Sequence, residues 1–140
     1  MVEQVQPTTQ DIIAVAEFRS ALRHFLRRSE KVARQSGLTP QRYTLLMMIK
    51  GSPDGGEQST VTDLSERMQL AQSTVTELVR RAESAGLIER EQSQRDARVA
   101  HLRLSPEGER RLMLSFTELA TERAQLREAF ASLDGGVTGH

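Results

Sequence analysis

The sequence predicts a mainly α-helical fold with a small β-hairpin, in the arrangement of a winged helix-turn-helix between long terminal helices. Two short amphipathic helical patterns separated by a tight turn occupy residues 60–85. Two short strand patterns around a polar tip follow at residues 87–104. Long helical patterns at 9–36 and 106–133 flank this module. A chain of 140 residues is long enough for a single domain with a real core, so we expect one domain over residues 1–140.

The first helix is expected over residues 9–36, where apolar residues recur close to the 3.6-residue period. Gly37 is a typical residue at the end of a helix. Thr39 as N-cap and Pro40 at the first helical position then start a second helix that runs to about Lys50. That helix is apolar nearly all round, which predicts a central, buried position.

Residues 51–59, GSPDGGEQS, form the clearest loop of the chain. Residues 60–61 are a candidate for a very short strand. Helices are then expected over roughly 62–68 and 72–85, and Gly86 ends the second of them.

The last helix starts at Ser105, the expected N-cap, with Pro106 at its first position. Steps of four and three residues separate its apolar positions, and Arg123 occupies the one missing place, so the pattern is a heptad seam of about three repeats. Such a seam is typical of dimerisation, but it also suits packing against the chain's own first helix. Residues 134–136, Asp-Gly-Gly, are expected to end the helix. The seam consists of Leu112, Phe116, Leu119, Leu126, Phe130 and Leu133.

The fourth helix carries polar side chains off its apolar stripe, and these have the chemistry that reads base edges in a DNA major groove. Glutamine pairs with adenine, threonine contacts the thymine methyl group, and arginine binds guanine or phosphate. An ordinary solvated helix face explains the same residues equally well, and Glu77, Glu83 and the zero net charge favour that alternative. The candidate DNA-binding residues are Gln72, Ser73, Thr74, Thr76 and Arg80.

The hairpin tip contains Arg95, Asp96 and Arg98. Arginine at such a tip can enter a DNA minor groove, where the negative potential is strong. An intervening aspartate is useful if it holds one guanidinium in place and leaves the other free. The alternative is an exposed hairpin with an incidental ion pair of little energetic value.

Composition excludes several classes of function. There is no cysteine, which excludes disulfides and thiolate metal sites, and no histidine pair has metal-ligand spacing. No apolar run approaches the roughly 20 residues that span a bilayer, and the N-terminus lacks a signal-peptide core, so we expect a cytoplasmic protein without membrane contact. No nucleophile elbow, phosphate loop or acid pair indicates an enzyme, and no cofactor is expected. Lysine and arginine balance aspartate and glutamate at 19 each, so any basic surface must arise by local clustering.

Three segments together resemble the MarR family of bacterial transcription regulators. They are LTPQRYTLLMMI at 38–49, TVTDLSERMQLAQSTVTELVRRAESAGLIER at 60–90 and RDARVAHLRLSPEG at 95–108. The signal is specific because several motifs agree in order and in spacing.

The resemblance implies an obligate homodimer that binds double-stranded DNA at a palindromic operator, most simply as a repressor. Residues 38–105 would form the DNA-binding region, with the polar residues of the fourth helix in the major groove. Arg98 would enter the minor groove, supported by Arg95, while Asp96 orients an arginine. The helices 9–36 and 106–133 would form the dimer, using the seam together with Ile12, Val15 and Leu22.

Many members of that family are released from DNA by small, often aromatic and anionic ligands. The resemblance therefore implies a possible effector, for which His24, Arg42 and Tyr43 are the candidate contacts. A regulator that needs no ligand remains an alternative. So does a winged-helix module that binds a protein and no longer reads DNA.

The sequence departs from the family pattern at three places. Gln69 stands where the turn usually has glycine, at a cost of about 1–2 kcal/mol for a left-handed non-glycine residue. Ala71 replaces the usual serine at the start of the recognition helix, and a missing N-cap hydroxyl costs about 1 kcal/mol. A further helix often follows the heptad helix in the family, so here we expect the dimer to rest on the first and last helices alone.

Overall fold

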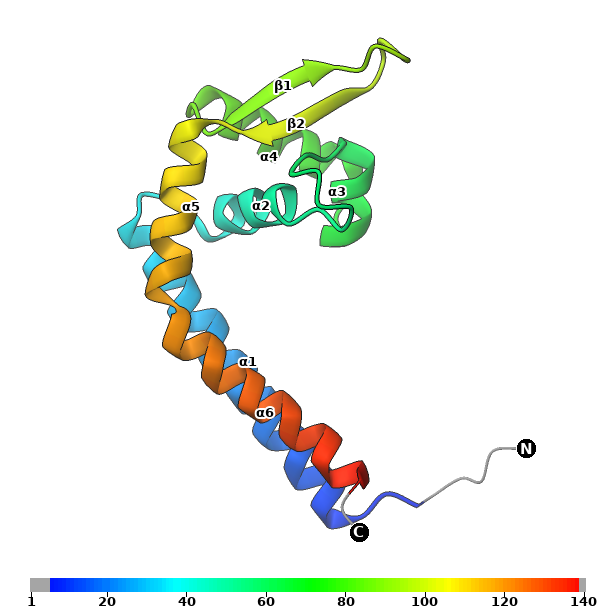
Figure 1. Ribbon diagram of the computed structural model, residues 1–140, viewed down its shortest axis with the longest axis vertical. Helices are drawn as coiled ribbons and strands as arrows, with labels where there is room; N and C mark the ends of the chain where they lie inside the picture. The colour runs from blue at the N-terminus through cyan, green and yellow to red at the C-terminus, as the bar shows by residue number, and fades with distance from the viewer. Residues whose placement is uncertain (1–5, 139–140) are drawn as a thin grey trace, which may run out of the picture. The chain divides into compact units, whose positions relative to one another are not determined.

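The computed structural model describes residues 6–138, with side chains described for residues 6–133. The predicted fold class is confirmed: helices predominate, and the strands β1 and β2 form a small antiparallel sheet (Figure 1). In chain order the elements are α1 (Thr9–Gln35), α2 (Pro40–Lys50), α3 (Val61–Met68), α4 (Gln72–Ser84), β1 (Ile88–Gln92), β2 (Ala100–Leu104), α5 (Pro106–Glu118) and α6 (Ala120–Thr138).

The chain forms two compact units. One contains the chain up to Val32 together with the chain from Thr117 onward, and the other contains Ala33–Phe116. The second unit therefore holds the whole helix-turn-helix and hairpin.

In the first unit, α1 and α6 run antiparallel and side by side (Figure 1). The rings of Phe18 and Phe130 meet edge to face with centroids 5.9 Å apart. Arg28 Nε donates to Glu122 Oε2 at 3.1 Å. These contacts join helices that lie at opposite ends of the sequence.

In the second unit, α2 is the central helix, as its apolar pattern predicts. Thr39 caps it by accepting a hydrogen bond from the Arg42 backbone N–H at 3.1 Å, and Pro40 opens it. The buried side chains of the unit come from α2 itself and from α3, α4, β1, β2 and α5. They include Leu45, Leu46, Ile49, Leu64, Val75, Val79, Leu87, Leu102 and Leu112.

The hairpin pairs in the register Ile88 with Leu104 through Gln92 with Ala100. The expected short strand at 60–61 is wrong. Ser59 makes the bridge instead, exchanging backbone hydrogen bonds of 3.0 and 2.8 Å with Leu102. Thr60 is the N-cap of α3 and accepts from the Asp63 backbone N–H at 3.1 Å, because its extended backbone directs the hydroxyl toward the free N–H groups of the first turn.

The expected single helix over 106–133 is also wrong in detail. A turn at Leu119 separates α5 from α6, although the Arg123 backbone N–H still bonds to the Leu119 carbonyl at 2.8 Å. No glycine or proline marks this break. Conversely, α6 continues through Gly135 and Gly136 to Thr138, because glycine weakens a helix by only about 1 kcal/mol and does not forbid it.

Candidate DNA-binding interface

The turn between α3 and α4 keeps its left-handed residue despite the absence of glycine. Gln69 has φ 56° and ψ 44°, and its side-chain amide donates to the Glu66 carbonyl at 2.7 Å. Ser65 Oγ donates to the Leu70 carbonyl at 2.6 Å, and the Leu70 N–H returns a bond to the Ser65 carbonyl at 3.1 Å. The turn is therefore closed on both sides of the strained residue.

Helix α4 begins without a side-chain cap. Ala71 has the extended backbone of an N-cap residue, but it has no oxygen to accept from the N–H groups of the first turn. Those N–H groups point out of the helix end, a geometry that favours an anion such as a DNA phosphate.

The predicted polar residues of α4 all lie on its exposed surface. Val75, Leu78, Val79 and Ala82 are buried in the unit and fix which side of the helix faces the solvent. We call the exposed set the recognition face: Gln72, Ser73, Thr74, Thr76 and Arg80.

From the sequence, two acidic residues of α4 were evidence against DNA binding. In the structure, each of them accepts hydrogen bonds from arginine side chains. Glu77 accepts hydrogen bonds from Arg80 and Arg81. Glu83 accepts two from Arg90 of β1, at 2.7 and 3.2 Å. Their charges are thus compensated locally. The spacing of Glu77 from Arg80 and Arg81 is visible in the sequence, whereas the Glu83–Arg90 pair joins two elements and is not.

The Glu83–Arg90 pair also fixes the hairpin relative to the recognition helix. The guanidinium and carboxylate meet through two parallel hydrogen bonds, a geometry that restrains orientation as well as distance. The pairing raises the pKa of Arg90, chiefly through its hydrogen bond to Glu83. The helix and the hairpin are therefore presented to a partner as one body.

The hairpin tip is ordered by short-range hydrogen bonds. Ser93 Oγ accepts from the backbone N–H groups of Arg95 and Asp96 at 3.2 and 3.3 Å. Asp96 Oδ1 accepts from the Arg98 backbone N–H at 3.0 Å and from Arg98 Nε at 3.2 Å. These bonds lower the pKa of Asp96, the backbone bond contributing most and the side-chain bond next.

Asp96 therefore holds Arg98, and the side chain of Arg98 is 91% exposed at the tip. Arg95 is exposed as well, and the structure shows no side-chain bond for it within the described part of the chain. The tip presents one guanidinium in a fixed orientation and a second that can move.

The start of α5 is fastened under the hairpin. Ser105 Oγ donates to the Gly86 carbonyl at 2.6 Å and accepts from the Gly108 N–H at 3.0 Å. A Cβ on Gly108 would lie 2.1 Å from the Leu87 carbonyl oxygen, so no other residue matches this approach. The glycine of the Ser-Pro-Glu-Gly motif is needed for this contact, a role that sequence reasoning missed.

The predicted dimerisation residues fall into three groups by their burial within one chain. Leu112 and Leu119 are buried within the chain, while Leu22, Leu126 and Leu133 are half-buried. The other four are partly to largely exposed: Ile12 at 64%, Val15 at 49%, Phe116 at 38% and Phe130 at 60%.

The predicted effector residues are divided between the two units. His24 lies on exposed α1, with Nδ1 2.9 Å from the Ser20 carbonyl oxygen. Arg42 is half-buried and Tyr43 is buried on α2 in the other unit. Over residues 6–138, no helix has the length and apolar character to cross a membrane. Among the described side chains of residues 6–133, no three acidic or histidine groups gather to hold a metal ion.

Comparison with known proteins agrees with this architecture. The family model of the MarR family matches residues 36–99. A curated relative, the uncharacterized HTH-type transcriptional regulator YsmB of Bacillus subtilis, is 32% identical over 130 residues, covering 89% of this chain and 84% of its own length.

Solved structures share the fold at lower identity. A MarR family transcription regulator has a TM-score of 0.69 at 23% identity, covering 91% of this chain and 82% of its own. A mutant of MarR from E. coli, complexed with operator DNA, has a TM-score of 0.68 at 15% identity, covering 96% and 98%. The family comprises regulators and not enzymes. The chain belongs to the MarR family of DNA-binding transcriptional regulators.

Proposed function

We propose that the protein is a homodimeric repressor that binds a palindromic operator, with α4 in the major groove and the hairpin tip in the adjacent minor groove. The observation that carries this proposal is the tip itself: Asp96 holds Arg98 in place while its side chain is 91% exposed. A guanidinium so oriented and so little covered has no packing role, and it has the charge and shape that enter a minor groove.

The recognition face supports the same proposal. It gathers amide, hydroxyl and guanidinium groups at the beginning of α4, and the Glu83–Arg90 pair ties α4 to the hairpin. A helix in one groove and a hairpin in the next require such a fixed relation. Among the solved structures with a similar fold, a mutant of E. coli MarR is described as complexed with operator DNA.

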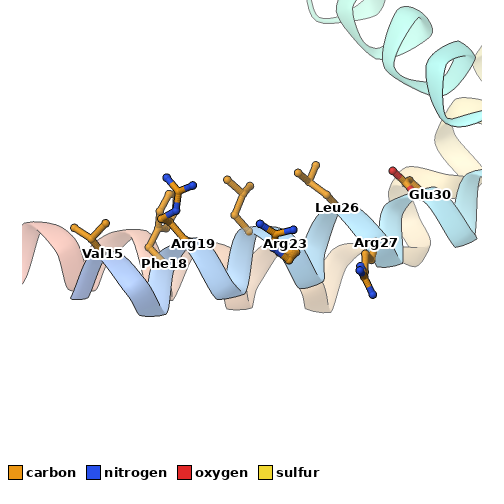
Figure 2. A pocket seen from close by; sticks show the side chains of 8 residues that line it. Val15, Phe18, Arg19, Arg23, Leu26, Arg27 and Glu30 are labelled. Carbon is orange, nitrogen blue, oxygen red and sulfur yellow. The ribbon is translucent and has the colours of Figure 1, made fainter. Parts of the chain in front are cut away.

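A second copy of the chain is proposed to cover the exposed apolar side of α1. The helix lines a groove of about 630 Å³ with Val15, Leu22 and Leu26 among arginines. In Figure 2, Val15, Arg19 and Leu26 point to the same side of α1, whereas Arg27 points to the other. An apolar stripe on a surface helix, together with the exposed ring of Phe130, is the usual character of a dimer interface.

Dimerisation also explains how a chain with zero net charge binds DNA. One copy offers few phosphate contacts, but two copies held at a fixed spacing bind one duplex together, so the second half-site adds its full contact energy without a second loss of translational freedom. A cytoplasmic location follows from the proposed partner, because bacterial operator DNA lies in the cytoplasm.

The proposal includes release of the protein from DNA by a small effector. An aromatic anion would need a cation and an apolar surface, and His24, Arg42 and Tyr43 remain the candidate contacts. Thermal unfolding in the presence of a panel of aromatic acids tests this part, since a ligand at a hundredfold excess over its Kd stabilises the folded protein by about 2.7 kcal/mol.

DNA binding is tested by fluorescence anisotropy on duplexes from the region upstream of the gene and on random duplex, at low and moderate salt. Arg98→Ala and Arg95→Ala should each weaken upstream binding by about 1–3 kcal/mol per lost contact, without changing the unfolding temperature. Arg110→Ala removes an arginine on α5 whose side chain is 59% exposed, and it should leave upstream binding unchanged. Unchanged affinity in both tip variants would favour a protein-interaction module instead.

Dimerisation is tested by sedimentation of Val15→Glu, which places a charge on the apolar side of α1. We expect monomers and a loss of upstream DNA binding, because a buried unpaired carboxylate costs several kcal/mol. Gln10→Glu adds the same charge to the same helix at another exposed position and should leave the dimer intact. A dimer that survives Val15→Glu would contradict this interface.

A further inference from the structure

The carboxylate of Glu77 lies in the middle of the exposed side of α4. Successive residues of a helix are rotated by about 100°, so Ser73, Glu77 and Arg80 fall opposite the buried stripe that contains Val75 and Val79. Glu77 was not part of the predicted recognition face, yet it occupies its centre. An acid at this place would point toward the floor of a major groove.

Glu77 holds two arginines at once. Its Oε2 accepts from Arg80 Nε at 3.0 Å, and its Oε1 accepts from Arg80 Nη2 at 2.5 Å and from Arg81 Nε at 3.0 Å. The three side chains are largely solvent-accessible, with exposures of 66% for Arg80, 63% for Arg81 and 43% for Glu77. Exposed ion pairs of this kind add little to folding stability, so stability alone does not account for the arrangement.

The geometry leaves half of the Arg80 guanidinium available. A guanidinium has five N–H donors in one plane, and Glu77 takes one from Nε and one from Nη2. The end formed by Nη1 and the second Nη2 hydrogen remains open. That end has the two parallel donors that match O6 and N7 of guanine.

We propose that Glu77 is a positioning residue that directs Arg80 to the edge of a guanine and thereby sets the preference for a G·C pair in each half-site. The inference rests on the proposed DNA binding. Without the carboxylate, the flexible Arg80 side chain can turn toward the phosphates, which surround it and carry no sequence information. With it, the guanidinium plane is fixed and its open fork faces the bases.

The same carboxylate opposes binding to DNA in general. It cancels one of the two positive charges next to it and brings a negative charge close to the phosphates. Its removal should therefore strengthen binding to random duplex while it weakens discrimination. Opposite signs for these two quantities are a signature that damage to the helix cannot produce, because damage lowers both.

The chain contains a matched control on α5. Glu107 accepts from Arg110 Nε at 2.9 Å, from Arg110 Nη2 at 2.6 Å and from Arg111 Nε at 2.8 Å, which repeats the Glu77 arrangement three and four residues along a helix. Glu107→Gln therefore removes one negative charge from an equivalent local network that lies away from the recognition face.

The experiment starts from a pool of random duplexes, from which the wild-type dimer selects a preferred sequence. Affinities of the wild type, Glu77→Gln and Glu107→Gln are then measured for the selected duplex, for variants with each G·C pair changed to A·T, and for random duplex. We expect Glu77→Gln to lower the ratio of selected to random affinity about fivefold or more, with the loss concentrated at one base pair of each half-site. Its random-duplex affinity should rise, with a salt slope steeper by up to about 0.9.

A second variant tests whether Glu77 acts through Arg80. Arg80→Lys keeps the charge but loses the planar fork, so it should lose the same base preference, and Glu77→Gln combined with Arg80→Lys should lose little more than either alone. An unchanged ratio in Glu77→Gln, an equal loss in Glu107→Gln, or additive losses in the double variant would overturn the inference. Enrichment of no sequence by the wild type would instead overturn the proposed function.

Discussion

The contact between Gly108 and Leu87 gives the sharpest test of how α5 is attached to the hairpin. In Gly108→Ala the new Cβ would lie 2.1 Å from the Leu87 carbonyl oxygen, whereas real Cβ atoms essentially never come within 3.0 Å of a non-bonded heavy atom. The two segments must separate by about 0.9 Å, because a backbone carbonyl cannot rotate away as a flexible side chain can.

This separation would stretch a hydrogen bond that joins the same two segments. The Ser105 N–H bonds to the Leu87 carbonyl at 2.9 Å, and a shift of this size stretches that bond beyond useful range, which costs about 1 kcal/mol. Overpacking adds about 1–3 kcal/mol, while alanine regains about 1 kcal/mol of helix propensity. We expect a loss of about 2 kcal/mol in the free energy of unfolding.

Urea unfolding measures this loss, with all variants at one protein concentration because the stability of the proposed dimer would depend on concentration. Gly56→Ala is the control, because its Cβ would meet only the exposed Asp54 side chain, at 3.0 Å, and no backbone atom, and it should change the free energy by less than about 0.5 kcal/mol. A Gly108→Ala protein as stable as the wild type would refute the close approach of α5 to the hairpin.

Three further predictions concern α4, the hairpin and α5. Ala71→Ser supplies the missing N-cap oxygen and should raise the free energy of unfolding by about 1 kcal/mol, as read by urea unfolding; no gain would mean that α4 does not begin at Gln72. Arg90→Ala should lower the free energy of binding to the selected duplex by more than it lowers the free energy of unfolding. Arg90→Lys should not restore the binding, because lysine cannot form two parallel bonds to Glu83. Arg110 and Arg111 lower the pKa of Glu107 to about 2, so its contribution to stability is present above pH 4.5 and lost as the pH falls toward 2. Unfolding temperatures from pH 6 to pH 2.5 should therefore fall less in Glu107→Gln than in the wild type, and parallel curves would contradict that assignment.

Local signals in the sequence predicted most of the fold. Thr39 with Pro40 and Ser105 with Pro106 mark helix starts by chemistry that acts within one turn, and the structure has both helices begin there. The apolar residues on nearly all sides of α2 likewise predicted its burial. These features depend on neighbours in the sequence, so a single sequence displays them.

The features that escaped prediction depend on distant parts of the chain. Ser59 pairs with Leu102, and Arg90 pairs with Glu83 across two elements, so no periodicity reveals either contact. The break at Leu119 has no glycine or proline to announce it.

At the interface, the sequence supplied the exposed residues of α4 and the tip, but not how they are held. It left open which arginine Asp96 contacts, and the structure shows that it is Arg98. It treated Glu77 as evidence against DNA binding, although the spacing to Arg80 and Arg81 was present as a signal of local pairing. A charge sum cannot distinguish a compensated acid from a free one.

Footprinting of the wild-type protein on its selected duplex tests the central claim, a dimer on a two-fold symmetric site, most directly. Two symmetric half-sites should be protected, with major-groove protection centred about one helical turn apart and minor-groove protection beside each centre that disappears in Arg98→Ala. Protection of a single site, protection without symmetry, or a minor-groove footprint that survives Arg98→Ala would contradict the account.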